Sequence, residues 1–249
     1  MLKLVLVAIY RRKSWSNIKK AAVKCVLLTL FFARLRPSEF LTQKSSSADI
    51  KCDVMASDLT FWHTIQNGVK KRSVTIWIRG AKVKKDFGDT VTLPEIVEQP
   101  SLCPYRALKK YLRYRKYISN DLNLPVILTE SLFSHKKNIS TTGMFGYYSI
   151  RSFNSDIKQL VASLGPRVQN IAKQLTAHSL RASVVTELRS LEGIDDLVLK
   201  SLGRWNSEAF RIYCRDREND RIATSHLESH YVDLIVNKKH NKKADELND

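Results

Sequence analysis

The stretch His178-Ser179-Leu180-Arg181 places an imidazole three residues before a guanidinium. If a helix begins here, residues three apart lie on one face, so both side chains would project in the same direction. About 0.4 such pairs are expected by chance in a chain of this composition, so the pair alone does not identify a site. Its meaning depends on the residues that precede and follow it.

Residues suited to binding or attacking a phosphate stand in order along the chain around this pair. Arginine offers a planar fork of N–H donors for phosphate oxygens, and tyrosine offers a hydroxyl nucleophile. In chain order they are Arg36 with Ser38 and Glu39, a lysine in a predicted turn, His178 with Arg181, Leu202-Gly203-Arg204-Trp205, and Tyr213. A single tyrosine on a helix is more often a core residue, so the interpretation of Tyr213 depends on this order.

In this order the sequence resembles the tyrosine recombinase, or phage integrase, family. The pattern of that family is an arginine, a lysine, a His-x-x-Arg pair, a histidine or tryptophan, and a nucleophilic tyrosine. The resemblance covers about residues 15 to 215 and includes Leu102-Cys103-Pro104 at the start of a helix. The segment from Gly203 to Phe210, followed by Tyr213, is most similar to recombinases of eukaryotic mobile elements such as cryptons and DIRS-like retroelements.

The resemblance implies a role for each residue at a scissile phosphate. Arg36 and Arg181 would bind the phosphate oxygens, and Tyr213 would attack the phosphorus and form a 3′-phosphotyrosine without a cofactor. His178 would assist proton transfer, and Trp205 would pack against the site and donate from its indole nitrogen. The alternative to phosphate binding is that each arginine forms an ordinary salt bridge with a nearby carboxylate. For Arg36 the partner in such a salt bridge would be Glu39. The resemblance implies that Glu39 also orients Arg36.

Two features depart from the family pattern. Counting from Gly203 puts Arg204 at the histidine or tryptophan position, whereas Trp205 has the right chemistry one residue later. Only about thirty-five residues precede Arg36, so we expect the usual N-terminal core-binding domain to be missing.

A turn between two predicted strands carries the candidate general acid. Lys82, Lys84 and Lys85 all lie in it, and we favour Lys82 because it follows the strand most closely. The other two lysines are candidate DNA contacts.

Hydrophobic periodicity predicts a mainly helical α+β fold with a small antiparallel β-sheet. The resemblance implies that this fold is like that of tyrosine recombinase catalytic domains. Residues 1–10 are apolar and are expected to pack as a helix or strand at the edge of the core. Helices are predicted at 15–33, after Pro37, from 103 onward, and at 147–164, 179–192, 195–202 and 208–215, with a hairpin formed by 73–79 and 90–93. The first of these helices is expected to be amphipathic, with Lys19, Lys20 and Lys24 toward solvent.

The charge balance favours a polyanionic partner. The 42 Lys and Arg against 24 Asp and Glu give a net charge of +18, which suits nucleic acid, an anionic membrane surface or acidic proteins. The helix from 103 has a predicted basic face that could follow a phosphate backbone or could simply be solvated. This face comprises Arg106, Lys109, Lys110, Arg113, Arg115 and Lys116.

Several classes of protein are disfavoured by the sequence. The four cysteines, Cys25, Cys52, Cys103 and Cys214, have no paired spacing, so we expect reduced thiols and no metal site. The apolar N-terminal stretch is well short of the roughly 20 residues of a membrane span, and it is followed by no cleavage site of a signal peptide.

The expected organisation is a catalytic domain at residues 1–215, a helix at 216–236 for exchange between protomers, and a polar tail at 237–249. The resemblance implies double-stranded DNA as partner, a homotetramer on two DNA sites, and strand exchange in DNA integration; a eukaryotic element would place it in the nucleus. Two alternatives remain: a type IB topoisomerase-like nicking and sealing enzyme, and a DNA-binding protein derived from a mobile element that no longer cuts.

Overall fold

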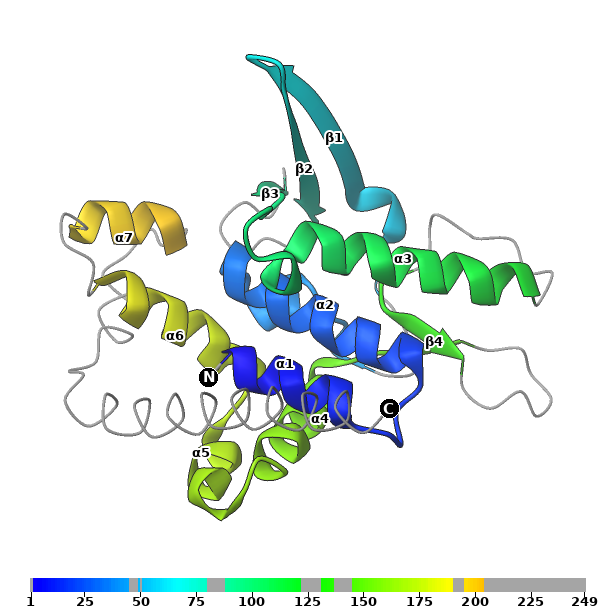
Figure 1. The fold of residues 1–249 in the computed structure, drawn as a ribbon, viewed down its shortest axis with the longest axis vertical. Coiled ribbons are helices and arrows are strands. Elements are labelled where there is room, and N and C mark those ends of the chain that lie inside the picture. Colours follow the sequence, from blue (N-terminus) through cyan, green and yellow to red (C-terminus); the bar gives the residue numbers. More distant parts are fainter. Residues whose placement is uncertain are drawn as a thin grey trace, which may run out of the picture.

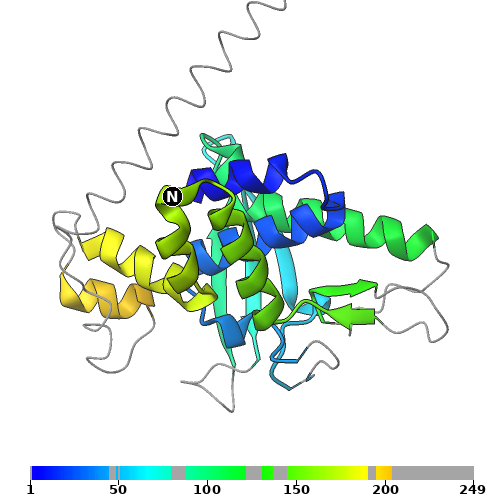
Figure 2. The ribbon, with the colours of Figure 1, turned by 90° about the horizontal axis from the view of Figure 1, so that it is seen from below.

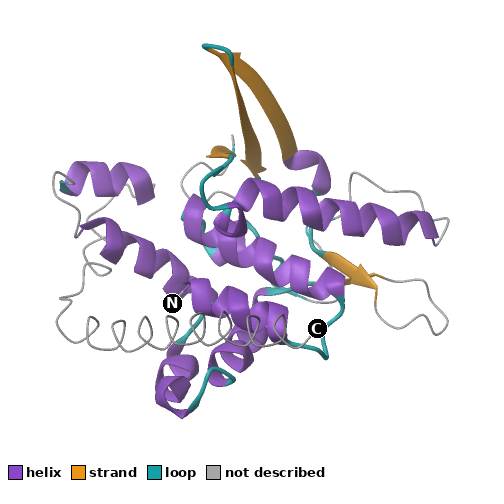
Figure 3. Cartoon of the chain, in the orientation of Figure 1, coloured by secondary structure: helices purple, strands orange, loops and turns teal. Residues whose placement is uncertain are grey.

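The computed structural model describes residues 2–44, 49, 51–79, 88–121, 131–136, 145–189 and 195–203. This part of the chain is mainly helical, with one three-stranded and one two-stranded antiparallel sheet (Figure 3). The predicted α+β class is therefore confirmed. The helices predicted at 208–215 and 216–236, and the tail at 237–249, lie outside the described residues.

The described strands occupy the middle of the chain, with helices before, between and after them. The helices are α1 (Leu2–Arg11), α2 (Asn17–Ala33), α3 (Pro104–Asp121), α4 (Ile150–Ala162), α5 (Gln169–Gln174), α6 (Ala177–Arg189) and α7 (Asp196–Gly203). Short 3-10 turns are η1 (Pro37–Glu39), η2 (Ala56–Asp58), η3 (Pro100–Leu102) and η4 (Pro166–Val168). The strands are β1 (Leu59–Gln66), β2 (Val69–Ile78), β3 (Asp89–Pro94), β4 (Ser134–Lys136) and β5 (Phe145–Tyr147).

Helix α2 is the centre of the core. It contacts α1, α3, α4 and α6, and Figures 1 and 2 show these helices arranged around it. Successive residues from Cys25 to Leu28 are all buried, so α2 is apolar on every side along its middle rather than amphipathic as its sequence predicts. The apolar stripe from Ile18 to Leu30 predicts one buried face, whereas α1, α3, α4 and α6 pack on several faces of α2.

The three-stranded sheet has the order β1-β2-β3 and confirms the predicted hairpin between β2 and β3. Its buried side is formed by Val74, Ile76 and Leu93, while Trp77 points to the opposite, exposed side. Strand β1 was not predicted, although Asn67-Gly68 is a strong signal for a two-residue hairpin turn. Both of these residues have positive φ, 52° and 73°, as such a turn requires. Figure 1 shows the β1–β2 hairpin projecting beyond α3.

Helix α3 begins at Pro104 as predicted, and one of its faces is buried. Tyr105, Leu108 and Tyr111 pack into the core. The prediction that Arg115 belongs to the exposed basic face is wrong: Arg115 is buried and its Nη1 donates to the carbonyl oxygen of Leu132 at 3.3 Å. Its position seven residues after Leu108 places Arg115 on the core side of the helix. The spacing of the charged residues alone does not distinguish the core side from the solvent side.

Three of the four cysteines lie in the described part of the chain, as do helices α1 to α7. Cys25 and Cys103 are buried free thiols and Cys52 is an exposed one, while Cys214 lies outside the described residues. None of the described helices has both the length and the apolar character that a membrane span requires.

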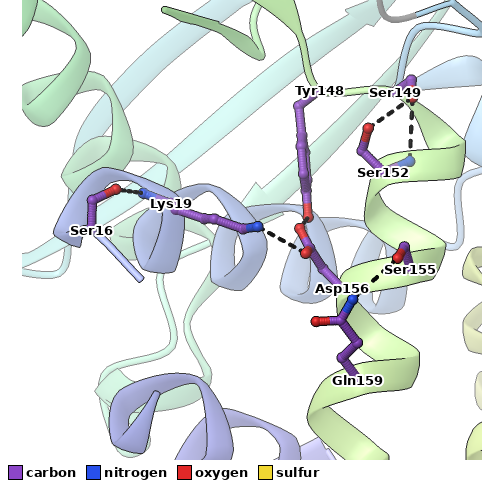
Figure 4. Close-up of polar contacts among 8 residues, drawn as sticks. All are labelled: Ser16, Lys19, Tyr148, Ser149, Ser152, Ser155, Asp156 and Gln159. Atoms are coloured by element: carbon purple, nitrogen blue, oxygen red, sulfur yellow. Dashed lines mark hydrogen bonds and ion pairs between the residues drawn. The ribbon is translucent and has the colours of Figure 1, made fainter. Parts of the chain in front are cut away.

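A buried carboxylate links α2 to α4 (Figure 4). The Tyr148 hydroxyl donates to Asp156 Oδ2 at 2.6 Å, and the Lys19 ammonium lies 2.9 Å from Asp156 Oδ1. Burial, together with the neighbouring Asp156 carboxylate, raises the pKa of Tyr148 well above its usual value. The phenol therefore stays protonated and serves as a hydrogen-bond donor that holds α4 against the core.

We expect Tyr148→Phe to destabilise the protein because Asp156 loses a buried donor while it keeps Lys19. A hydrogen bond to a charged group contributes about 2 kcal/mol to the free energy of unfolding. For a chain of this size the loss corresponds to a Tm lower by about 4–8 °C, measurable by thermal denaturation followed by circular dichroism. The matched control is Tyr147→Phe at the adjacent, half-buried tyrosine. Equal shifts in both variants would contradict the assigned role.

Candidate active site

Arg36 lies at a sharp change of chain direction after α2. Arg34 caps the helix in a left-handed conformation with φ 53°, and Pro37 is the first residue of η1. A residue before proline is restricted to extended backbone, and Arg36 has φ −69° and ψ 142°. The predicted helix after Pro37 is a single 3-10 turn. This turn brings Glu39 back toward Arg36.

The Glu39 carboxylate binds Arg36 through both its oxygens. Oε2 accepts from the Arg36 backbone N–H at 2.7 Å, and Oε1 accepts from Arg36 Nη1 at 2.9 Å. The Glu39 side chain is only 2% exposed, whereas that of Arg36 is 22% exposed. The guanidinium therefore has a fixed position and still reaches the surface.

Arg181 approaches the same carboxylate from another element. It is on the second turn of α6, is 1% exposed, and its Nη1 lies 4.0 Å from Glu39 Oε2. The start of α6 is fixed by Asn154 on α4, whose Oδ1 accepts from the Ala177 backbone N–H at 2.6 Å. One buried carboxylate thus faces two guanidinium groups that are far apart in the sequence.

His178 lies beside the two arginines and is the most exposed of the three side chains. Partial burial, then the charge of Arg181 and then that of Arg36 lower the pKa of His178 below its ordinary value. The imidazole is therefore neutral near pH 7 and can accept a proton. Two arginines against one carboxylate leave an excess positive charge, which favours an anionic ligand.

Four of the predicted site residues come together: Arg36, Glu39, His178 and Arg181. The remaining candidates of the predicted reaction lie outside the described residues. These are Lys82, Lys84, Lys85, Arg204, Trp205 and Tyr213. Among the described residues, no three histidine, cysteine or carboxylate side chains gather in a way that could hold a metal ion.

The basic residues of α3 form a separate group on a helix that packs against α2 (Figure 1). Arg106, Lys109, Lys110 and Arg113 are all exposed and lie on one side of the helix. Arg106 is engaged within the protein: its Nε lies 2.7 Å from Glu95 Oε1, and Arg72 binds the other oxygen of Glu95. All four residues remain candidate phosphate contacts, because the Arg106 side chain is 42% exposed beside Glu95.

Sequence reasoning missed the residues that orient the site. Asn154 has no sequence signal, because an asparagine inside a helix can cap another helix only through the tertiary fold. Thr176 and Ser179 do have a sequence signal, because their three-residue spacing is typical of a helix N-cap. The Ser179 backbone N–H donates to Thr176 Oγ1 at 3.3 Å, and the Thr176 N–H donates to Ser179 Oγ at 3.1 Å.

Comparison with solved structures shows a known fold. The chain is similar to the crystal structure of the XerH site-specific recombinase bound to difH substrate in a pre-cleavage complex. The two share 19% sequence identity with a TM-score of 0.52, and the match covers 89% of this chain and 50% of the XerH chain. It is similar to the XerH post-cleavage complex with palindromic difH, at 20% identity and a TM-score of 0.52, with 91% and 51% covered. The chain thus spans about half the length of these structures. Its mainly helical architecture with a three-stranded antiparallel sheet matches their fold. No family model and no curated protein matches the sequence.

We expect His178 to titrate below its ordinary pKa of 6.5 when followed by NMR. Arg36→Gln should raise this pKa, because it removes one of the charges that disfavour the imidazolium. The control is Arg151→Gln, an exposed arginine on α4, which should leave it unchanged. An ordinary pKa in the unchanged protein would contradict the electrostatic description.

The same shift predicts how stability depends on pH. Between the lowered pKa of the folded state and 6.5, the unfolded state binds more protons, so stability attributable to His178 falls as the pH drops through this window. His178→Gln should remove this part of the pH dependence in urea unfolding.

Proposed function

We propose that this chain cleaves and rejoins double-stranded DNA as a tyrosine recombinase, through a covalent bond between Tyr213 and a backbone phosphate. The observation that carries the proposal is the convergence of Arg36 and Arg181 on the buried carboxylate of Glu39, with His178 beside them. The fold supports it, because the similar XerH structures are complexes of a recombinase with its DNA substrate.

The two arginines stabilise the phosphate during the reaction. A phosphodiester has one negative charge, and its pentacoordinate transition state develops more charge on the non-bridging oxygens. Guanidinium groups held in place before the substrate arrives do not have to reorganise as that charge develops. Glu39 supplies the rigidity for Arg36, through contacts with both its backbone and its side chain.

Tyr213 performs the nucleophilic step. Its hydroxyl oxygen bonds to phosphorus, the bond from phosphorus to the 5′-oxygen breaks, and a 3′-phosphotyrosine and a free 5′-hydroxyl result. The phenolic proton passes to neutral His178, and Lys82 gives a proton to the departing 5′-oxygen. Attack by the 5′-hydroxyl of another strand reverses these steps and releases Tyr213.

Other residues and partners complete the proposal. Trp205 packs against the phosphate site and donates from its indole nitrogen, with Arg204 as the alternative at this position. Exposed Arg106, Lys109, Lys110 and Arg113 on α3 contact the DNA backbone. Four protomers act on two DNA sites, residues 216–236 dock on a neighbouring protomer, and the reaction integrates a eukaryotic mobile element in the nucleus.

We expect Tyr213→Phe to abolish covalent attachment to a nicked suicide DNA while leaving DNA affinity nearly intact, because only the attacking oxygen is removed. Adduct formation is measured on a denaturing gel, and affinity by fluorescence anisotropy. Tyr10→Phe, at an exposed tyrosine of α1, is the matched control and should form adduct normally. A normal amount of adduct with Tyr213→Phe would refute the assignment of the nucleophile.

We expect Lys82→Ala to cleave ordinary DNA slowly, by about 100-fold or more, the usual contribution of a general acid. DNA in which sulfur replaces the bridging 5′-oxygen should be cleaved nearly as fast as by the unchanged protein, because a thiolate leaves without a proton. Single-turnover cleavage of both substrates measures this. If Lys84→Ala or Lys85→Ala is the variant rescued by sulfur, that lysine is the acid instead. If none is rescued, no lysine of this turn is the acid.

A further inference from the structure

We infer that the end of the β1–β2 hairpin, residues 63–72, is a second element that binds double-stranded DNA, apart from the arginine pair at Glu39. We call these residues the hairpin tip. The inference goes beyond the proposed function, because DNA binding by the hairpin tip requires no cleavage. The backbone of the whole hairpin belongs to the described part of the chain.

The hairpin tip extends past the rest of the sheet as a ribbon of two strands. Strand β3 pairs with β2 only from Ser73 to Ile78, whereas the pairs from His63–Arg72 to Gln66–Val69 join β1 and β2 alone. At about 3.3 Å per residue, these four pairs extend the ribbon by about 13 Å. The described side chains of the hairpin tip are exposed, so they are accessible to a partner (Figure 1).

The charges of the hairpin are of one sign. Residues 59–78 contain no aspartate or glutamate, and Lys70, Lys71 and Arg72 are consecutive. Because successive side chains of a strand point to opposite sides, Lys70 and Arg72 lie on one side of the ribbon and Lys71 on the other. Basic groups on both sides suit an anionic partner that encloses the ribbon, as the two phosphate backbones enclose a groove of DNA.

One side of the hairpin faces the basic residues of α3. Arg72 Nη1 lies 3.3 Å from one oxygen of Glu95, and Arg106 Nε lies 2.7 Å from the other. Nearer the core, the Phe61 ring of β1 meets the Tyr105 ring of α3 edge to face, with 5.5 Å between the ring centroids. The basic surface of the hairpin tip therefore continues onto the exposed basic face of α3.

The shape of this surface favours DNA over a membrane. The major groove is about 12 Å wide and admits a two-stranded ribbon, whereas the minor groove, at about 6 Å, does not. The basic face from Arg106 to Arg113 covers about 10 Å along α3. Figures 1 and 2 both show the strands running across the axis of α3. A flat anionic membrane cannot follow both arms of such a surface, whereas a grooved rod can.

The test measures affinity for a short labelled DNA duplex by fluorescence anisotropy at several salt concentrations. We expect the double variant Lys70→Gln/Lys71→Gln to bind about 10-fold or more weakly, with the slope of log affinity against log salt smaller by about 2. The matched control is Lys3→Gln/Lys173→Gln, which removes the same charge from exposed lysines of α1 and α5. Figure 1 shows α5 at the opposite end of the molecule from the hairpin. Charges this far apart are screened, so the control should bind within about 2-fold of the unchanged protein.

Three results would overturn the inference. The first is an unchanged affinity and salt slope in Lys70→Gln/Lys71→Gln, and the second is an equal loss in the control, which would reflect net charge alone. The third uses Ile65→Ser, which removes an apolar side chain that is 76% exposed at the hairpin tip. If this variant loses binding to vesicles that contain phosphatidylserine while the lysine variant keeps its DNA affinity, the hairpin tip binds a membrane instead.

Folding and activity are separated from the binding result. Because the lysines are exposed, circular dichroism should be unchanged, and Lys70→Arg/Lys71→Arg should keep the DNA affinity. If the double glutamine variant fails to fold, Lys70→Gln decides alone, with about half of the change in slope. Failure of the proposed function looks different, because the unchanged protein would then form no adduct with suicide DNA while the affinities could still be compared.

Discussion

The candidate site depends on one buried carboxylate. Arg36 and Arg181 carry like charges, and Arg181 is almost completely buried, so holding both in one place is costly unless a negative charge lies between them. Glu39 supplies that charge at 2.9 Å from Arg36 and 4.0 Å from Arg181. Without Glu39 the buried guanidinium would lose this opposing charge, whereas with it both forks are fixed before any anion arrives.

The helical core is arranged so that Glu39 and Arg181 meet. Helix α2 is buried on all sides along its middle and is capped by Arg34, and the turn that follows, which carries Glu39, begins with Pro37. Helix α6 comes much later in the sequence and brings Arg181 to the same carboxylate. Its first turn is fixed by Asn154 of α4. Helix α4 in turn is tied back to α2 by the contacts of Asp156 with Tyr148 and Lys19. A displacement of any of these three helices therefore changes the distance between the guanidiniums.

The features that could be predicted from the sequence are those that depend on residues close together in the chain. The spacing of His178 and Arg181, the break at Pro37 and the start of α3 at Pro104 are properties of a few adjacent residues, and the predicted elements follow from them. The burial of Arg115 and the capping role of Asn154 depend on which elements pack together, which no single segment encodes. Strand β1 is a different case, because the turn signal at Asn67-Gly68 is local and was overlooked. The roles of the residues outside the described part rest on the resemblance alone.

The arginine pair and the edge of the three-stranded sheet are held by different physical means. The arginines are fixed by burial in the helical core, where a carboxylate and close packing leave little freedom. The edge of the sheet is instead held by the ion pair of Arg79 with Asp58 and by the contact of Trp77 with Gly88. The placement of the two arginines therefore depends on the packing of the helical core, while the sheet edge depends on two local contacts. Sequence changes at that edge can therefore alter the local contacts of the sheet without changing how Glu39 holds Arg36 and Arg181 together.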